Sequence, residues 1–387
     1  MQGFGSFEPD ERGRLCYLPV VPPFPKLDDV WGQLQRATRA VEEFDRALAA
    51  FPVPDVVGKL FARLDAVHSS GAEGATTTFT DLLEYQSSLG RAKDPEDARE
   101  VAATAEAFDE LSAQGEAVSY IDTALFIHRR LFERASDPMV AAGAGKLKVH
   151  PNGTYDPESL GATFFYTAPA STSQALAAWE AFTAEANDRP ELVRQALSHW
   201  WFEHIHPVPD GNGRVGRLLV PLALRRKGAL GHACAFLGEA VHLNKNVYVD
   251  ALKDARRTGE LSAWTRVFCS MVAQSAASNL DRLEQLGQIY TRWLAATKSM
   301  RSHSVVHRLV PWVITKPTFT VRDALTQLAG TVTFQAMNTA IKRLIDLGIV
   351  TQLDGGGRDR LFTASEVIRL FEPIDVSSTS SSAAMLP

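Results

Sequence analysis

The sequence predicts a mainly α-helical protein, in which a helical bundle with one small β-hairpin is followed by a second, smaller domain. Three observations lead to this prediction. Apolar residues recur at helical spacing up to about residue 300, and residues 140–170 interrupt that spacing with glycines, prolines and two β-prone runs. Beyond residue 300 the pattern changes to three short helical segments followed by two short strands.

Four regions are expected along the chain. Residues 1–118 form an N-terminal helical region, residues 119–299 a core, residues 300–373 the second domain and residues 374–387 a tail. The tail is rich in serine and has almost no apolar surface to bury, so we expect it to be disordered.

The N-terminal region is expected to begin with an extended arm and to continue as helices. Prolines in residues 1–26 remove backbone donors and restrict their neighbours, so this arm should lie extended along the helical body. Apolar spacing predicts two helices in residues 27–68, separated by a turn at Pro52 and Pro54. A small, polar segment follows at residues 69–78.

Further helices are predicted by the same spacing. One begins within Phe79–Leu83, with Thr80 or Asp81 as its N-cap. The others lie at Pro95–Ala113, Val118–Phe132, Gln174–Ala186, Glu191–Ile205, Val215–Leu224 and Ser262–Ser299. The helices at 191–205 and 215–224 have little polar face, which places both in the middle of the bundle, on either side of one polar loop. Pro221 predicts a kink in the second of them.

Composition limits the class of protein. The 387-residue chain has 40 Lys and Arg against 45 Asp and Glu, so its net charge of -5 gives no overall attraction to nucleic acid or to an anionic membrane. Its three cysteines lie far apart without CxxC spacing, which argues against a disulfide framework or a thiolate zinc site. No signal peptide or membrane-spanning run is evident, so we expect a soluble, cytoplasmic protein without a membrane partner.

The loop between the two buried helices, residues 206–217, has the sequence HPVPDGNGRVGR. Its glycines satisfy GxGxxG, but a dinucleotide site needs a preceding strand, and the preceding segment is helical in pattern. A P-loop is excluded because no Lys-Ser/Thr pair follows the glycines. Two other interpretations are a metal site of His204, His206 and Asp210, although i and i+2 on a helix diverge, and a structural helix start with solvated arginines.

The charges of this loop favour phosphate chemistry. Arg214 and Arg217 lie one turn apart on an apolar helix, where two guanidinium groups repel each other unless an anion lies between them. The free N–H groups of residues 211–213 and the helix dipole attract negative charge. Asp210 suits Mg²⁺, which carboxylates and phosphate oxygens bind together, and His206 is a base that titrates near neutral pH. The loop therefore predicts phosphoryl or nucleotidyl transfer.

The loop resembles the Fic family signature HPFx(D/E)GNGRxxR at every defined position except Val208, where that family usually has Phe. The upstream WWFEHIHP also resembles that family, and LNKNVYVDAL at residues 243–252 resembles its NRxxYY segment, with Val249 in place of the second Tyr. The resemblance covers about residues 15–290. It implies a Fic-type helical bundle with a β-hairpin flap.

The resemblance also implies an activity, that of a protein adenylyltransferase, which uses ATP and Mg²⁺ or Mn²⁺ to attach AMP to a protein hydroxyl. His206 would be the catalytic base and Asp210 the metal ligand. The implied nucleotide-binding residues are Gly211, Asn212, Gly213, Arg214 and Arg217 for the phosphates, with Asn244 and Tyr248 for the adenosine. The small Gly213 favours AMP transfer, because Fic relatives that act as kinases carry Lys there.

Two partners follow from the same resemblance. The flap, about residues 148–166, would align a segment of a target protein by main-chain pairing. Self-modification is a second route, in which the chain is its own target.

An inhibitory segment is implied at residues 69–74, SSGAEG, which resemble the (S/T)xxxE(G/N) helix N-terminal to many Fic cores. Ser69 and Glu73 occupy its defined positions, and Ala72 stands where relatives often have Ile. A Glu in a small polar segment is usually solvated, but Arg217 would be an unpaired cation without nucleotide. We therefore expect a bidentate Glu73–Arg217 pair that occupies the space of the γ-phosphate and keeps the enzyme inactive.

The second domain has the element order of a winged helix-turn-helix. Its predicted elements are an initial helix, helices at Val321–Leu328 and Thr333–Leu347, and two strands around Asp354–Arg360. As an alternative function, Thr333–Lys342 would enter a DNA major groove while Arg358 and Arg360 contact phosphate. A DNA-binding regulator and a protein-interaction scaffold both stay open, as do a catalytically silent Fic scaffold and a homodimer.

Overall fold

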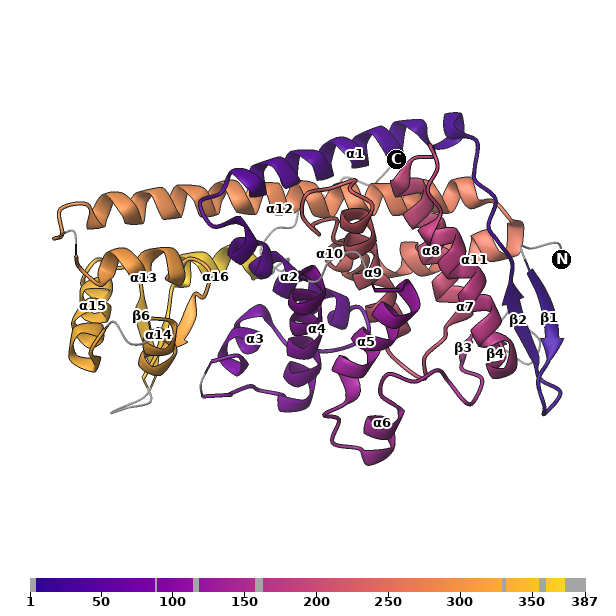
Figure 1. Cartoon of the computed structure of the whole chain (residues 1–387), viewed down its shortest axis with the longest axis horizontal. Coiled ribbons are helices and arrows are strands. Elements are labelled where there is room, and N and C mark those ends of the chain that lie inside the picture. The colour runs from indigo at the N-terminus through magenta and orange to yellow at the C-terminus, as the bar shows by residue number, and fades with distance from the viewer. Residues whose placement is uncertain are drawn as a thin grey trace, which may run out of the picture. The chain divides into compact units, whose positions relative to one another are not determined.

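The computed structural model describes residues 5–87, 89–113, 118–156, 163–301, 303–328, 332–354 and 360–372. The chain is mainly helical, as predicted, and has two small sheets (Figure 1). It divides into two compact units, Met1–Thr77 with Arg91–Glu284, and Thr78–Gly90 with Gln285–Pro387. The division therefore falls inside a long helix and not at residue 300, and a short N-terminal segment belongs to the second unit.

The first unit is a bundle of helices. They are α1 (Leu27–Ala50), α2 (Pro54–Gly71), α4 (Pro95–Ala113), α5 (Tyr120–Phe132), α6 (Pro138–Gly143), α7 (Pro169–Ala184), α8 (Glu191–Ile205), α9 (Asn212–Arg226), α10 (Gly238–Leu243), α11 (Lys245–Thr258) and the first part of α12 (Leu261–Thr297). The predicted helices are all present, with ends that shift by a few residues. Helices α6, α10 and α11 are additional, and α6 and α10 are only six residues long.

Helix α8 lies in the core of this bundle, as its apolar sequence predicts. It packs between α7 and α9, and Trp200 and Trp201 are at most 1% exposed. The indole N–H of Trp264 on α12 donates to the backbone carbonyl of Ala196 at 2.6 Å, so the buried polar atom of this ring is satisfied. Both ends of the loop at residues 206–211 are therefore fixed to buried, well-packed helices.

Helix α2 extends further than predicted. The sequence places a polar segment at residues 69–78, but the helix continues to Gly71, and Ser69 and Ser70 are each 1% exposed. This part of the prediction was wrong because the low helix propensity of Ser and Gly is outweighed by packing of α2 against α10 and by hydrogen bonds to Arg217. Glu73 consequently follows directly after a rigid helix.

The first sheet joins the N-terminal arm to the flap. Its strands β1 (Gly5–Pro9), β2 (Leu15–Pro19), β3 (Gly153–Tyr155) and β4 (Thr163–Phe165) lie in the order β1-β2-β4-β3. The predicted hairpin is confirmed as the antiparallel β3–β4 pair, while residues 157–162 lie outside the described part. The arm is extended but forms its own hairpin, and Cys16 of β2 pairs in parallel with Phe165 of β4. One edge of the flap is thus occupied by the chain's own N-terminus.

The second unit contains the three helices and the two strands predicted for residues 301–373, and a strand, β5, and a helix, α16, that were not predicted. Its elements are α3 (Phe79–Tyr85), the end of α12, α13 (Val306–Val313), β5 (Thr318–Thr320), α14 (Val321–Gln327), α15 (Phe334–Asp346), β6 (Thr351–Asp354), β7 (Leu361–Thr363) and α16 (Ser365–Phe371). The three strands pair antiparallel in the order β5-β7-β6. Arg360 donates to the Asn338 side chain, whereas Arg358 and the predicted tail at 374–387 lie outside the described residues. DNA binding by this unit stays a prediction.

Helix α3 is part of the core of the second unit. Its N-cap is Thr78, which forms a capping box with Asp81, so the predicted caps Thr80 and Asp81 were wrong. Thr80 instead donates its backbone N–H to Glu372 at 3.0 Å, and the ring of Phe79 stacks on that of Phe371 at 5.0 Å. A single cut near residue 300 would remove both partners, so it would not separate the two units cleanly.

This packing gives a stability prediction. Phe79 is fully buried, so Phe79→Ala should lower the free energy of unfolding of the second unit by about 3–5 kcal/mol. Phe334→Ala on α15 is the matched control, because Phe334 is 56% exposed and its loss should cost within about 0.5 kcal/mol. Urea unfolding followed by hydrogen exchange of peptides from residues 285–372 would measure both variants. Equal midpoints for the two variants would show that Phe79 is not part of this core.

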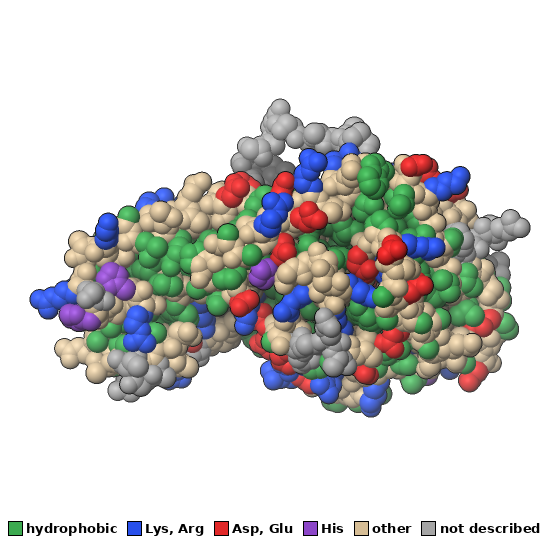
Figure 2. Space-filling view, turned by 45° about the horizontal axis from the view of Figure 1, so that its top comes forward, with side chains coloured by type: hydrophobic (Ala, Val, Ile, Leu, Met, Phe, Trp, Pro, Cys, Tyr) green, Lys and Arg blue, Asp and Glu red, His purple; other side chains and the backbone are tan. Residues whose placement is uncertain are grey.

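The surface carries charges of both signs. On the face shown in Figure 2, Lys and Arg side chains alternate with Asp and Glu, in agreement with the small net charge of the chain. Among the helices that the structure describes, none is long and apolar enough to cross a membrane.

Candidate active site

A left-handed residue shapes the loop between α8 and α9. His206 has φ 51° and ψ 59°, and within the described ranges no other residue except glycine has a positive φ. Its backbone N–H caps α8 by donating to the carbonyl of Phe202. This conformation is costly for a residue with a side chain, so the surrounding contacts must impose it. The turn directs the imidazole into a cavity.

Two asparagines hold the loop in place. The side chain of Asn212 accepts the N–H of Val208 at 3.0 Å and donates to the carbonyl of Val208 at 2.8 Å. The amide of Asn152 donates to that same carbonyl at 2.8 Å, and the ammonium of Lys148 donates to the carbonyl of Ile205 at 3.0 Å. The side chain of Asn212 is therefore occupied by the loop, and only its backbone N–H is available for the phosphate contact that the resemblance implies.

The imidazole of His206 is fixed in one orientation. It stacks on the ring of Tyr166 with centroids 3.9 Å apart, and Nδ1 lies 3.0 Å from the backbone carbonyl oxygen of Glu203. A carbonyl only accepts, so Nδ1 carries the proton and Nε2 keeps its lone pair. Burial lowers the pKa of His206 to about 4, below the near-neutral range expected from the sequence. The ring is therefore neutral at pH 7 and able to accept a proton at Nε2.

Asp210 lies at the mouth of the cavity, and its side chain is 78% exposed. Its Oδ1 accepts the N–H of Gly211 at 2.7 Å, while Oδ2 lies 3.9 Å from Arg214. No cluster of three or more His, Cys, Asp or Glu that could hold a metal occurs among the described residues, so the interpretation with His204 and His206 as further ligands finds no support. A single exposed carboxylate fits Mg²⁺ that is shared with phosphate oxygens and water.

Arg217 is the most enclosed charge of the site. It is 2% exposed, its Nε donates to the Ser69 hydroxyl at 2.8 Å, and its Nη2 donates to the Ser69 carbonyl at 2.9 Å. Nη2 also contacts Oε1 of Glu73 at 2.7 Å. The expected pair with Glu73 is thus present but has one contact and not two, because Ser69 occupies Nε and shares Nη2.

Gly213 makes room for this pair. A Cβ at residue 213 would lie 2.4 Å from Oε1 of Glu73 and 2.8 Å from Nη1 of Arg217, and both distances are shorter than non-bonded atoms allow. Burial raises the pKa of the Glu73 carboxyl, but the charge and hydrogen bond of Arg217 outweigh it and hold this pKa below its usual range. Glu73 is therefore ionised at neutral pH.

Arg214 lies away from the cavity. Its guanidinium pairs with Glu100 of α4 and lies over the ring of Phe132 at 5.2 Å. The two arginines of the loop therefore do not share an anion, as the sequence suggested, because each has a carboxylate of its own. A role of Arg214 in phosphate binding would require it to leave Glu100.

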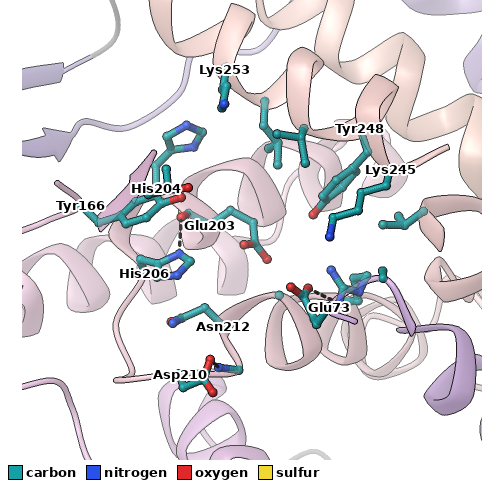
Figure 3. Close-up of a pocket in the computed structure, with 18 of the residues that line it drawn as sticks. Glu73, Tyr166, Glu203, His204, His206, Asp210, Asn212, Lys245, Tyr248 and Lys253 are labelled. Atoms are coloured by element: carbon teal, nitrogen blue, oxygen red, sulfur yellow. Dashed lines mark hydrogen bonds and ion pairs between the residues drawn. The ribbon is translucent and has the colours of Figure 1, made fainter. Parts of the chain in front are cut away.

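The cavity has a volume of about 430 Å³ (Figure 3). Of the predicted site residues, His206, Asp210, Gly211, Asn212, Gly213, Arg217, Glu73 and Tyr248 line it. Asn244 does not, because its amide donates to the Ala240 carbonyl and to Gln274. The hydroxyl of Tyr248 lies 2.7 Å from Nε2 of His199, so it is held by a second buried side chain.

Sequence reasoning missed several lining residues. Three basic residues of α11, Lys245, Lys253 and Arg256, line the cavity together with Tyr248. Tyr248, Lys253 and Arg256 follow Lys245 by three, eight and eleven residues, so all four lie on one face of the helix. That periodic basic face was the available signal. Arg256 also pairs with Asp156 at 2.6 Å and lies over the ring of Phe164 at 3.6 Å, so it fixes the flap to α11.

Two segments of the chain match a known protein family. Residues 119–224 match the Fic/DOC family. Residues 31–110 match the Fic/DOC family N-terminal region. A probable protein adenylyltransferase from Aquifex aeolicus (strain VF5) is 40% identical over 64 residues, which are 16% of this chain and 18% of that relative. The Fic/DOC match includes the whole of α5 to α8 and the loop with His206, while the chain matches less than a fifth of the curated relative.

Solved structures show the same fold. A Fic family protein from Desulfovibrio desulfuricans G20 is similar with a TM-score of 0.55 and 16% identity, over 89% of this chain and 98% of that one. A Fic domain containing signaling protein from Bacteroides thetaiotaomicron VPI-5482 has a TM-score of 0.51 and 18% identity, over 64% of this chain and 97% of that one. The helical bundle with its small β-hairpin is thus a Fic fold.

Proposed function

We propose that this protein is a protein adenylyltransferase that transfers AMP from ATP to a protein hydroxyl. The main support is the position of His206, whose Nε2 has no hydrogen-bond partner among the described residues and which lines a cavity together with Asp210, Arg217 and the start of α9. The first-turn N–H groups of a helix have no intrahelical acceptor and attract phosphate. A neutral base, an anion-binding helix start and an exposed carboxylate are the parts that nucleotidyl transfer needs.

In the proposed reaction, His206 accepts the proton of the target hydroxyl at Nε2. The hydroxyl oxygen then forms a bond to the α-phosphorus of ATP, and the bond between that phosphorus and the bridging oxygen of pyrophosphate breaks. The hydrogen bond from Nδ1 to the Glu203 carbonyl keeps the lone pair of Nε2 directed into the cavity and favours the ring that has gained a proton. Magnesium, held by Asp210, would offset phosphate charge.

The flap supplies a place for the target. Strand β3 is at one end of the sheet order β1-β2-β4-β3, and Tyr155 on it is 71% exposed. An edge strand offers unpaired backbone groups to an incoming extended segment. We propose that the target backbone pairs along β3, because β2 already pairs with the other strand of the flap.

Glu73 would hold this enzyme in an inactive state. Its carboxylate contacts the guanidinium of Arg217, which the resemblance assigns to the γ-phosphate. ATP could then bind only in a pose that leaves its γ-phosphate elsewhere.

Transfer of label distinguishes AMP transfer from phosphate transfer. With Mg²⁺, the Glu73→Gly variant should incorporate label into protein from α-labelled ATP and none from γ-labelled ATP, and intact mass should rise by one AMP per modified site. Asp210→Ala and removal of Mg²⁺ by chelation should each reduce incorporation about 10²-fold or more. Label from the γ-position would indicate a kinase, and no label from either position, with a cell extract added as target, would contradict the proposed function.

A further inference from the structure

A buried glutamate on the wall of the cavity is not used by the proposed reaction. Glu203 lies in the last turn of α8, lines the cavity and is 8% exposed. Its backbone carbonyl holds His206, but its side-chain Oε1 is buried and has no hydrogen-bond partner within the described part of the chain. A buried acceptor without a partner destabilises the folded protein. A bound ligand that donates a hydrogen bond to this oxygen, or a proton on the carboxyl, would remove that cost.

The surroundings of Glu203 come from several parts of the chain. Figure 3 shows its carboxyl between the imidazole of His206 and the Glu73 carboxylate. A Cβ on Gly216 of α9 would lie 2.4 Å from Oε1, so the carboxyl lies directly against the backbone of α9, next to Arg217. Nε2 of His199 is 3.9 Å from Oε1, but that nitrogen is engaged by the Tyr248 hydroxyl.

Few of these neighbours can balance a negative charge on Glu203. Burial lowers the pKa of His199 to about 3, so its ring is neutral at pH 7. The Tyr248 and Tyr166 hydroxyls are also neutral, since burial raises both of their pKa values. Glu73 is a second negative charge, and it already pairs with Arg217.

The balance favours a protonated carboxyl. Burial, with a contribution from Glu73, raises the pKa of Glu203 to about 7, although Arg217 acts in the opposite direction. The carboxyl therefore holds a proton more readily than a solvated glutamate does, in contrast to Glu73, whose contact with the same arginine keeps it ionised.

We propose that Glu203 is a phosphate-binding residue, which takes up a proton when the nucleotide binds and donates that proton in a hydrogen bond to a phosphate oxygen. The proposal rests on the proposed function, because it needs ATP in this cavity. A polyphosphate next to the carboxyl brings more negative charge into an enclosed site, and two adjacent negative groups cannot both stay ionised there. The proton comes from solvent, and no bond other than O–H forms.

Proton uptake by Glu203 makes nucleotide affinity depend on pH in one direction. Binding raises the pKa of Glu203 above its value of about 7 in the free protein, so binding consumes a proton. Nucleotide affinity should therefore be greatest below pH 7 and should fall by up to about tenfold per pH unit above it. A carboxylate that paired with Arg217 and stayed ionised would give no such dependence.

Isothermal titration calorimetry measures this proton directly. A non-hydrolysable ATP analogue with Mg²⁺ is titrated into the full chain, above pH 7, in buffers of different protonation enthalpy. The wild type should take up about 0.5–1 proton per bound nucleotide. In Glu203→Gln the amide is always neutral and a donor, so proton uptake should disappear and affinity should no longer depend on pH.

Two controls separate Glu203 from other titrating groups. His206→Ala should still take up a proton on nucleotide binding, because the group that takes it up is the Glu203 carboxyl and not the His206 imidazole. Glu191→Gln, on the same helix but outside the cavity, should match the wild type. Nucleotide binding by the wild type without proton uptake, or with the same uptake in Glu203→Gln, would overturn the inference alone. No nucleotide binding by any variant, Glu73→Gly included, would instead contradict the proposed function.

Discussion

Replacement of His206 by alanine should abolish AMP transfer while nucleotide binding persists. The variant removes the free Nε2 that would accept the hydroxyl proton, and a positioned base contributes about 10²–10⁴-fold. It leaves the start of α9, Arg217 and Asp210 in place, so the phosphate site survives. Labelled ATP in a Glu73→Gly background gives the rate, and calorimetry with a non-hydrolysable analogue gives the affinity.

A second variant tests whether any loss of activity comes from a changed loop conformation. His206 has a left-handed backbone, a conformation that asparagine adopts more readily than alanine. His206→Asn should therefore keep the turn, and with it nucleotide binding, but it has no group that accepts a proton at neutral pH. Transfer by either variant within tenfold of the parent rate would show that His206 is not the base.

The local part of this site could be predicted from the sequence. The buried helices on both sides of the loop are evident because their residues leave almost no polar face, and the structure places both in the core. The contact between Glu73 and Arg217, 144 residues apart, was predicted from an inhibitory motif and an unpaired cation. Its single-contact geometry was not, because nothing in the sequence showed that the hydroxyl and the carbonyl of Ser69 would bind the same guanidinium.

Other features depend on distant partners and could not be predicted. The pairing of Arg214 with Glu100 requires knowledge of which face of α4 approaches α9. The strands β1 and β2 are five residues each, and the pairing of β2 with the flap is set by long-range register and not by local propensity. The buried position of Glu203 is of the same kind, since its helix is buried on every side and the cavity exists only after α9 and α11 pack against it.

Glu73→Gly should raise AMP incorporation about tenfold or more at the same ATP concentration. The change removes the carboxylate that contacts Nη2 of Arg217 and frees that guanidinium for the γ-phosphate. Removing one partner of a fully buried Arg–carboxylate pair would cost about 3–5 kcal/mol. Here the contact is single and the Glu73 side chain is 44% exposed, so solvent screening reduces the effect. A tenfold change, which corresponds to about 1.4 kcal/mol, is the expected lower bound.

Three comparisons connect that increase to the Glu73–Arg217 contact. Glu73→Gln keeps the size and an acceptor oxygen but removes the charge, so its rate should lie between those of the wild type and Glu73→Gly. Asp97→Ala, in the same region, removes a carboxylate whose partner is Thr76 and should leave the rate unchanged within about twofold. Glu73→Gly combined with His206→Ala should be silent, because release of the arginine cannot replace the base. Equal rates for the wild type and Glu73→Gly, measured with α-labelled ATP, would mean that Glu73 does not inhibit this enzyme.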